Sequence, residues 1–367
     1  MTISRSGLRL RMVTMLVVVV FLLSACSGTG TPMPAQPPAP TQIPTVQPTT
    51  APAAQPTQAP PATKVPPTVA STVTPLLAVP TPEFMMKIAS EANPFNSPDS
   101  IALDAQGNIY VVDSGNSRIL KFDHNGQFLT QWGSEGSGDG QFQINGRFGP
   151  QGDVAIDAQG NVYVTDCYNY RVQKFDGDGK FLTKWGGEGG ASGQFEFPAG
   201  IAIDPQGNIY VTDPANNVIQ KFDENGKFLR SWGGPGTEDG LFNGTSGVAI
   251  DRDGNVYVAD YGNTRFQIFD GDGKFIAKIS WPFIDNRMMN AATDIAFDQT
   301  GNLYVADFMN SRVVKLDPTG QKLNVWGTAG MGAGQFTEPL SVAIDTDGSI
   351  YVVDGANQNV QKFRQPQ

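Results

Sequence analysis

Short hydrophobic runs, separated by polar turns, follow one another through most of the chain. One unit reads IALDAQGNIYVVD over residues 101–113 and continues with RILKF and FLTQW. The Asp-x-Gln-Gly-Asn segment between the first two runs is typical of a hairpin, because these residues suit tight turns and positive φ. Apolar residues do not recur at helical spacing. The pattern therefore predicts four short antiparallel strands per unit, with the almost continuously apolar second strand covered on both faces.

This unit recurs along the chain at a nearly constant period. Close copies start at Ile101, Val154, Ile201, Val248, Ile295 and Val342, so the starts lie 53, 47, 47, 47 and 47 residues apart. A fixed period of this size is the signature of a repeat architecture. Four strands in about 47 residues favour the blade of a propeller. We expect an all-β fold, a six-bladed β-propeller of four-stranded antiparallel blades.

The units resemble NHL repeats. The resemblance is carried by the Gly-Asn-x-Tyr-Val-x-Asp core, the Asn-x-Arg after it, Lys-Phe-Asp, and a tail of Trp-Gly, Gly-Gln-Phe and Pro, and it covers almost all of residues 84–363. It implies a six-bladed propeller, in agreement with the number of copies.

The two ends of the repeat region complement each other. The sixth unit stops after NVQKF (359–363) and lacks a fourth strand, whereas FMMKI (84–88) stands before the first unit and aligns with FLTKW (181–185). We therefore expect the N-terminal strand to complete the last blade, which closes the ring and removes an exposed strand edge.

The first 25 residues have the pattern of a secretory signal. Arg5, Arg9 and Arg11 precede an apolar run from Met12 to Leu23, which is too short to span a bilayer. The following Leu-Ser-Ala-Cys resembles a bacterial lipobox, which implies a lipidated N-terminal Cys26. Cys167 would then be the only other cysteine, so no internal disulfide is expected.

Residues 26–83 form a Pro/Thr/Ala-rich segment, and residues 84–367 form the repeat domain. The stretch 27–82 holds 16 of the 27 prolines and a single charge, Lys64, so we expect a disordered tether. Removing the signal takes away three of 25 basic residues and leaves 35 acidic ones, a net charge of −13. This charge argues against nucleic-acid partners and against membrane contact beyond the lipid anchor. We expect a monomer outside the cytoplasm, anchored to a membrane of the cell envelope or surface.

Several chemical motifs are better explained as structure. The aspartates of FDGDGK (175–180) occupy a turn where Asp, Asn and Gly interchange between units, which favours a hairpin over a calcium loop. An aspartate ends the second strand of every unit, and in four units an arginine follows five residues later, which predicts a cross-strand pair. The aspartates are Asp113, Asp166, Asp213, Asp260, Asp307 and Asp354, and the arginines are Arg118, Arg171, Arg265 and Arg312.

No catalytic set, metal site or cofactor site is indicated. His124 is the only histidine and lies alone in a turn, so neither zinc ligands nor a Ser/His/Asp set are present. The glycine-rich returns between units lack the helix that a dinucleotide site needs. Cys167 has no activating neighbour other than Arg171, which favours an incidental thiol. The four tryptophans that recur once per unit are expected to pack between blades.

The side chains that differ between units are the candidates for binding. They lie in the loops between the second and third strands and in the returns to the next unit, which we expect on one face of the ring. Exposed aromatic and apolar residues there indicate either a binding patch or local packing under a longer loop. The candidate ligand-binding residues are Tyr168, Tyr170, Tyr261, Trp281, Phe283, Arg287, Phe308, Met309 and Arg147.

These features favour a non-enzymatic propeller that binds a protein, peptide or glycan at the cell surface. The alternative is a carboxylate-based hydrolase or lyase that acts at the central channel.

Overall fold

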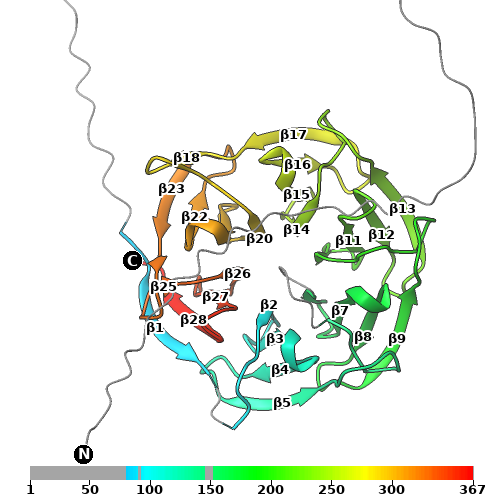
Figure 1. Cartoon of the computed structure of the whole chain (residues 1–367), viewed down its shortest axis with the longest axis horizontal. Helices are drawn as coiled ribbons and strands as arrows, with labels where there is room; N and C mark the ends of the chain where they lie inside the picture. The colour runs from blue at the N-terminus through cyan, green and yellow to red at the C-terminus, as the bar shows by residue number, and fades with distance from the viewer. Residues whose placement is uncertain (1–79, 90–91, 145–151, 367) are drawn as a thin grey trace, which may run out of the picture. The chain divides into compact units, whose positions relative to one another are not determined.

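The computed structural model describes residues 80–89, 92–144 and 152–366. The predicted signal segment, the tether up to Val79 and residues 90–91, 145–151 and 367 lie outside the described residues. Six four-stranded antiparallel sheets surround a common centre, and Figure 1 shows them as blades with β2, β14, β20 and β26 innermost. The all-β six-bladed propeller predicted from the repeats is confirmed. Among the described residues, no helix is long and apolar enough to cross a membrane.

In five blades the strands run from the centre to the rim in chain order, and in the sixth blade β1 supplies the rim strand. The innermost strands are β2 (Pro98–Leu103), β6 (Val154–Ile156), β10 (Ile201–Ile203), β14 (Thr245–Ile250), β20 (Ala292–Phe297) and β26 (Pro339–Ile344). The second strands are β3 (Ile109–Asp113), β7 (Val162–Asp166), β11 (Ile209–Asp213), β15 (Val256–Asp260), β21 (Leu303–Asp307) and β27 (Ile350–Asp354). The third strands are β4 (Arg118–Phe122), β8 (Arg171–Phe175), β12 (Val218–Phe222), β16 (Arg265–Phe269), β22 (Arg312–Leu316) and β28 (Asn359–Arg364). The rim strands are β5 (Phe128–Trp132), β9 (Phe181–Gly186), β13 (Phe228–Gly233), β17 (Phe275–Ser280), β23 (Lys322–Trp326) and β1 (Glu83–Ile88).

The sixth blade combines the two ends of the domain. Its strand order is β1-β28-β27-β26, and β1 pairs antiparallel with β28 from Glu83 opposite Arg364 to Ile88 opposite Val360. This is the closure predicted from residues 84–88, with the strand beginning one residue earlier. The pairing gives hydrogen-bond partners to the backbone groups on the outer edge of β28, and it joins the first and last repeats without a covalent link.

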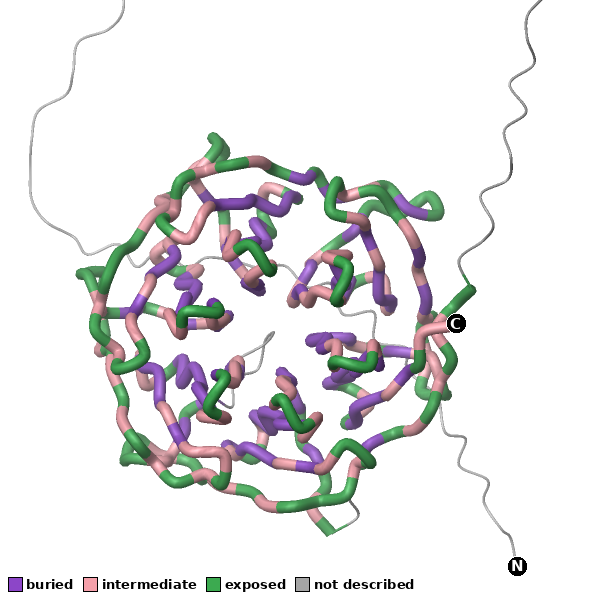
Figure 2. The backbone as a smooth tube through the Cα atoms, turned by 180° about the vertical axis from the view of Figure 1, so that it is seen from behind, coloured by how far each residue is buried: buried purple, intermediate pink, exposed green. Residues whose placement is uncertain are grey.

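The core lies between blades. Tyr163 and Val172 of the second blade, for example, share a buried cluster with Ile201 and Ile209 of the third. The second strands are buried throughout, whereas the rim strands alternate between exposed and partly buried residues (Figure 2). Each blade thus buries its two faces against its two neighbours, as expected for a repeat structure.

The recurring tryptophan fits against a turn of the next blade. The Trp132 ring lies 5.9 Å from that of Phe175, and a Cβ placed on Gly179 would meet the Trp132 ring at 2.4 Å. Gly179 also has φ +89°, which favours glycine on its own. The carboxylate of Asp176 accepts hydrogen bonds from the backbone N–H of Asp178 and Lys180 within this turn. The FDGDGK segment is therefore a hairpin that receives a tryptophan, and the predicted inter-blade packing is confirmed.

Short elements link the strands on one side of the ring. Single 3-10 turns follow four second strands, and two-stranded pairs lie in two of the returns. These elements are η1 (Ser114–Asn116), η2 (Cys167–Asn169), η3 (Tyr261–Asn263), η4 (Phe308–Asn310), β18 (Phe283–Ile284), β19 (Arg287–Met288), β24 (Thr328–Ala329) and β25 (Gln335–Phe336).

Candidate functional site

The aspartate that ends each second strand organises one face of the ring. Asp166 is fully buried, and its carboxylate accepts hydrogen bonds from Arg171 Nε at 2.7 Å and from the backbone N–H of Gln143 at 2.7 Å. Equivalent ion pairs at 2.7 Å join Asp113, Asp260 and Asp307 to their arginines. The predicted cross-strand pairs are confirmed. Their carboxylates hold the inter-blade return against the end of the blade, which is a structural role.

Backbone hydrogen bonds also bring the 3-10 turns and the returns together. The backbone N–H of Tyr168 donates to Gln143 O at 3.2 Å, and that of Gly262 donates to Asn243 O at 2.8 Å. The N–H of Met309 donates to Asn290 O at 3.3 Å. The second-to-third-strand turns and the returns therefore lie on one face of the propeller, as expected, and we call it the loop face.

Three side chains of the 3-10 turns are prominently exposed on the loop face. Tyr168 is 38% exposed, Tyr261 46% and Met309 55%. Tyr168 stands edge-on to Phe197 of the following return, with ring centres 5.6 Å apart. Phe308 and Tyr170 are half-buried. Tyr170 takes φ 55° because it ends the turn in the left-handed conformation.

The return after the fourth blade forms a small hairpin of β18 and β19. Asp285 and Asn286 make its turn with φ of 50° and 61°, which is the primed-turn geometry that suits a two-residue hairpin. Phe283 and Arg287 point outward and are exposed, with Phe283 at 68%. Ile284, by contrast, is buried at 2%. Both interpretations of the unusual return thus apply, because Phe283 and Arg287 are exposed whereas Ile284 belongs to the core.

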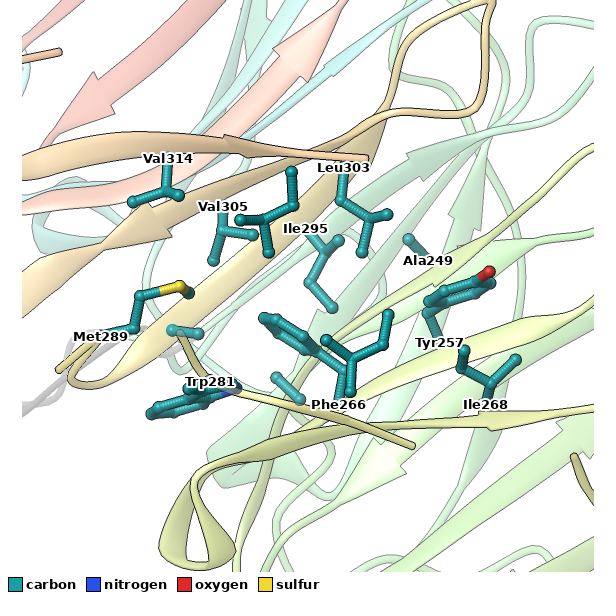
Figure 3. Packing of buried hydrophobic residues seen from close by; sticks show 14 of the residues in the cluster. Ala249, Tyr257, Phe266, Ile268, Trp281, Met289, Ile295, Leu303, Val305 and Val314 are labelled. Atoms are coloured by element: carbon teal, nitrogen blue, oxygen red, sulfur yellow. The ribbon is translucent and has the colours of Figure 1, made fainter. Parts of the chain in front are cut away.

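Trp281 corrects one prediction. The sequence placed it among exposed ligand-binding residues, but it is only 5% exposed and belongs to the core between the fourth and fifth blades. Figure 3 shows it with Met289 beneath the strands, and its ring lies 5.8 Å from that of Phe266. Ile284 of the hairpin belongs to the same buried cluster as Trp281. Two other candidates, Arg147 and the lipidation residue Cys26, lie outside the described residues.

Cys167 is inaccessible within its turn. Its side chain is fully buried in the core between the first and second blades, and burial together with the nearby Asp166 carboxylate raises its thiol pKa. A raised pKa disfavours the nucleophilic thiolate. This environment agrees with an incidental thiol.

A cavity of about 190 Å³ opens at the centre of the loop face. It is lined by residues of the first strands of four blades and by residues just before the first strands of the second and third blades, together with Phe197 and Pro214 from the loop face. Two of the lining residues, Asp153 and Asp294, come from the second and fifth blades, which lie opposite each other in the ring of six. We call this cavity the channel mouth.

The two aspartates occupy the same position in their repeats. It directly precedes the first-strand motif of each unit, and around the ring it holds Ser100, Asp153, Gly200, Gly247, Asp294 and Ser341. Comparing the repeats from one residue earlier would have revealed these two acids. The repeat motif starts at the first apolar residue of each unit, one position after these acids, and so does not include them.

Asp153 is held by its own blade and by both neighbouring blades. Asp153 Oδ1 accepts from Ser100 Oγ and from the N–H of Val154 at 2.8 Å, while Oδ2 accepts from the N–H of Ile201 at 2.8 Å. Both neighbouring blades thus bond to this carboxylate.

Asp294 has a closely similar set of partners. Its Oδ2 accepts from Ser341 Oγ at 2.6 Å and from the N–H of Val342 at 3.0 Å, and its Oδ1 accepts from the N–H of Ile295 at 2.8 Å. Burial and the charge of Asp153 raise its pKa from 3.8 to about 7, and burial also raises the pKa of Asp153. The channel mouth therefore contains one carboxyl group with a pKa near neutral and a second whose pKa is also raised.

Comparison with known proteins agrees with the repeat pattern. A model of the NHL repeat matches residues 95–122, 152–175, 195–222, 242–269 and 336–363. Five of the six blades thus contain a matched NHL repeat. The matched residues do not include the fifth blade, which follows the unusual return.

The curated relatives of this chain match only part of it. Peptidyl-glycine alpha-amidating monooxygenase B of Xenopus laevis is 39% identical over 92 residues, which are 23% of this chain and 10% of the relative. NHL repeat-containing protein 3 of Homo sapiens is 33% identical over 105 residues, 27% of this chain and 28% of the relative. The chain thus matches between about a tenth and about a quarter of the length of these curated relatives.

Solved structures similar to the NHL-repeat propeller show the fold. A catalytically inactive virginiamycin B lyase from Staphylococcus aureus with quinupristin has a TM-score of 0.54 at 14% identity, covering 77% of this chain and 99% of the lyase. A protein of unknown function from Bacteroides thetaiotaomicron has a TM-score of 0.56 at 15% identity, covering 77% and 73%. At these identities the likeness concerns the fold alone.

Proposed function

We propose that this NHL-repeat propeller is a non-enzymatic binding module at the cell surface and that it holds a protein or peptide partner on the loop face. The supporting observation is the exposure of Tyr168, Tyr261 and Met309 on 3-10 turns of three blades, all on the face where the channel mouth opens. Rigid aromatic groups on a preformed scaffold give large contact area at low entropic cost. The exposed Phe283 and Arg287 extend this surface beside the fifth blade.

The experiment compares three forms of the full chain as bait for envelope extract. One form is unchanged, and one carries Tyr168→Ser, Tyr261→Ser and Met309→Ser. The third is a matched control with Leu129→Ser, Leu182→Ser and Leu229→Ser, because these leucines are similarly exposed but lie on the rim strands. We expect the loop-face variant to capture at least about tenfold less of a specific partner that the other two forms capture equally. Equal capture by all three forms would refute the loop face as the site. Retention of the capture after protease treatment of the extract would identify the partner as a glycan.

We also propose that Cys26 carries a lipid that anchors the chain outside the cytoplasm. Support comes from the signal-like first 25 residues, the Leu-Ser-Ala-Cys sequence and the proline-rich segment after it. Cys26→Ala should move the protein from the membrane fraction to the soluble fraction. Unchanged sedimentation with membranes would contradict the anchor.

A second function has one observation in its favour. A carboxylate-based hydrolase or lyase needs an acid and a base near neutral pH, and the channel mouth holds Asp153 and Asp294, both with raised pKa. Turnover of an envelope substrate that is abolished by Asp294→Asn would favour this function over binding alone.

A further inference from the structure

The charged side chains of the loop face are almost all acidic. Among the described residues of the inter-blade returns and of the turns after the second strands, the only cation is Arg287. The arginines that begin four third strands are paired with buried aspartates and are balanced in this way. The described acids of the returns are Glu135, Asp139, Asp153, Glu188, Glu196, Glu238, Asp239, Asp285 and Glu338. A surface with charges of one sign attracts a partner with charges of the opposite sign.

The glutamates of this face have no cationic partner within the protein. Lysines of the rim strands pair with three aspartates of the returns, namely Lys184 with Asp139 at 2.6 Å, Lys278 with Asp239 at 2.7 Å and Lys322 with Asp285 at 3.6 Å. No ion pair in the described ranges includes a glutamate. The exposed glutamates of the returns are Glu135, Glu188, Glu196 and Glu238. Their charge is therefore available to a partner.

Aspartates on the opposite face of the ring are used by the fold. Each turn between a first and a second strand begins with an aspartate whose Oδ1 accepts two backbone N–H groups of the same turn. Asp204, for example, accepts from Gln206 at 3.0 Å and from Asn208 at 2.8 Å, and Lys221 Nζ lies 4.0 Å from it. Acidic residues thus build turns on that face, whereas the return glutamates of the loop face do not.

Three of the four exposed glutamates flank the third blade. Glu188 and Glu196 lie in the return that enters this blade, and Glu238 lies in the return that leaves it. The third blade also lacks the arginine of its neighbours, so the buried Asp213 adds a carboxylate that has no ion pair among the described residues. Asp213 accepts from the N–H of Glu196 at 2.9 Å, which holds the entering return against the end of the blade. Negative charge is therefore concentrated at this part of the loop face.

Hydrogen bonds connect these returns to the exposed Tyr261 of the fourth blade. Asn217, at the end of the third blade's turn, accepts through Oδ1 from the N–H of Gly244 at 2.8 Å. Gly244 O in turn accepts from the N–H of Tyr261 at 3.0 Å, and Glu238 O accepts from Arg265 Nη2 at 2.8 Å. The tyrosine and the two returns thus belong to one fixed surface. We call Glu188, Glu196, Glu238 and Tyr261 the acidic sector.

We propose that the acidic sector docks a basic segment of a partner protein, with arginine or lysine side chains facing the glutamates. This inference rests on the proposed binding function of the loop face and states the chemistry of its partner. Arginine and lysine carry a cationic head on an apolar stem, so they can contact both a carboxylate and the Tyr261 ring. Nucleic acids and anionic lipids carry the wrong charge for this surface. Across the described part of the chain, no group of three or more His, Cys, Asp and Glu side chains is arranged to hold a metal ion.

The test measures binding of a terminally blocked peptide of alternating arginine and alanine to the full-length protein by surface plasmon resonance. A variant with Glu188→Gln, Glu196→Gln and Glu238→Gln should bind at least about tenfold more weakly than the unchanged protein. The matched control carries Glu224→Gln, Asp253→Asn and Asp272→Asn, which remove the same charge from exposed acids on the turns of the opposite face. Its affinity should stay within about threefold, because charges beyond the Debye length are screened. A peptide with glutamate in place of arginine should not bind.

Tyr261→Ser separates docking at the acidic sector from diffuse attraction to an acidic protein. This variant keeps every charge, so it should leave the association rate nearly unchanged and raise the dissociation rate at least about threefold. The glutamine variant, by contrast, should mainly lower the association rate and its dependence on salt. Equal affinity of the glutamine variant and its control, or an unchanged dissociation rate in Tyr261→Ser, would overturn the proposal. Saturable calcium binding that displaces the peptide would assign the surface to a metal ion and would overturn it as well.

The glutamine variant also serves as bait for envelope extract, which distinguishes this inference from the proposed function. A partner lost by both the glutamine variant and the loop-face serine variant supports the inference, provided that replacing its arginines and lysines by glutamate at the contact abolishes capture. Loss in the serine variant with full capture by the glutamine variant would keep the binding function and overturn the basic partner. Equal capture by all forms would overturn both.

Discussion

Two sets of enclosed aspartates lie close together in this propeller and differ in their partners. Asp166 and its equivalents end the second strands of all six blades, and in four blades they meet an arginine at 2.7 Å. Asp153 and Asp294 occur in two blades, meet only hydroxyl and amide donors, and have raised pKa values. Within the described residues, four members of the first set pair with an arginine, and neither member of the second set has an ion pair. The difference separates carboxylates that an arginine holds in the fold from carboxylates whose burial raises their pKa.

The largest expected effect concerns the first set. Asp166→Ala removes the partner of Arg171 and leaves a buried guanidinium without its ion pair, so we expect the free energy of unfolding to fall by about 3–5 kcal/mol. Chemical denaturation followed by tryptophan fluorescence measures this loss.

The third blade provides the matched control for this variant. Val218 stands where the arginine is found in other blades, so Asp213 accepts from the backbone N–H of Glu196 and Phe197 without an ion pair. Asp213→Ala should cost less, about 1–3 kcal/mol, since it leaves amides rather than a charge unpaired. An equal cost at both positions would show that the ion pair adds nothing to stability.

Features that recur in several blades were predictable from the sequence. The Asp–Arg pairs, the inter-blade tryptophans and the closing strand β1 each follow from copies that occupy equivalent positions, because one blade predicts the contacts of the next. Features that occur once were not. Trp281 has no copy to compare with, and only the structure shows that it lies in the core.

The channel mouth was missed for a different reason. Asp153 and Asp294 lie 141 positions apart in the sequence. Each resembles an ordinary polar residue at the start of a strand. They come together only because six first strands converge at the centre of the ring. Repeat comparison identifies the position, but the closure of the ring is what makes it a site.

The next effect concerns the second set and depends on pH. The pKa of Asp294 is raised from 3.8 to about 7, so the folded state binds a proton that the unfolded state releases between these values. This group therefore stabilises the fold at low pH, and the contribution is lost as pH rises toward 7 and above. The unfolding free energy of the unchanged protein should therefore fall by about 2 kcal/mol more between pH 5 and pH 8 than that of Asp294→Asn. Denaturant titrations at both pH values measure the fall, and a difference between the two proteins that is independent of pH would contradict the raised pKa.

The smallest effect tests whether the channel mouth is built for the fold or for a ligand. Thr245→Val replaces a buried hydroxyl that has no partner among the described residues with a methyl group of similar shape, so it should leave stability unchanged or raise it by about 1 kcal/mol. Thr212→Val is the matched control, because Thr212 Oγ1 accepts from the N–H of Gly200 at 2.8 Å and donates to Ser246 O at 3.0 Å. The control should lose about 1–2 kcal/mol. Thermal unfolding of both variants measures the difference. If Thr245→Val destabilises the propeller as much as Thr212→Val does, its hydroxyl serves the fold, and the contrast between the two sets does not extend to this side chain.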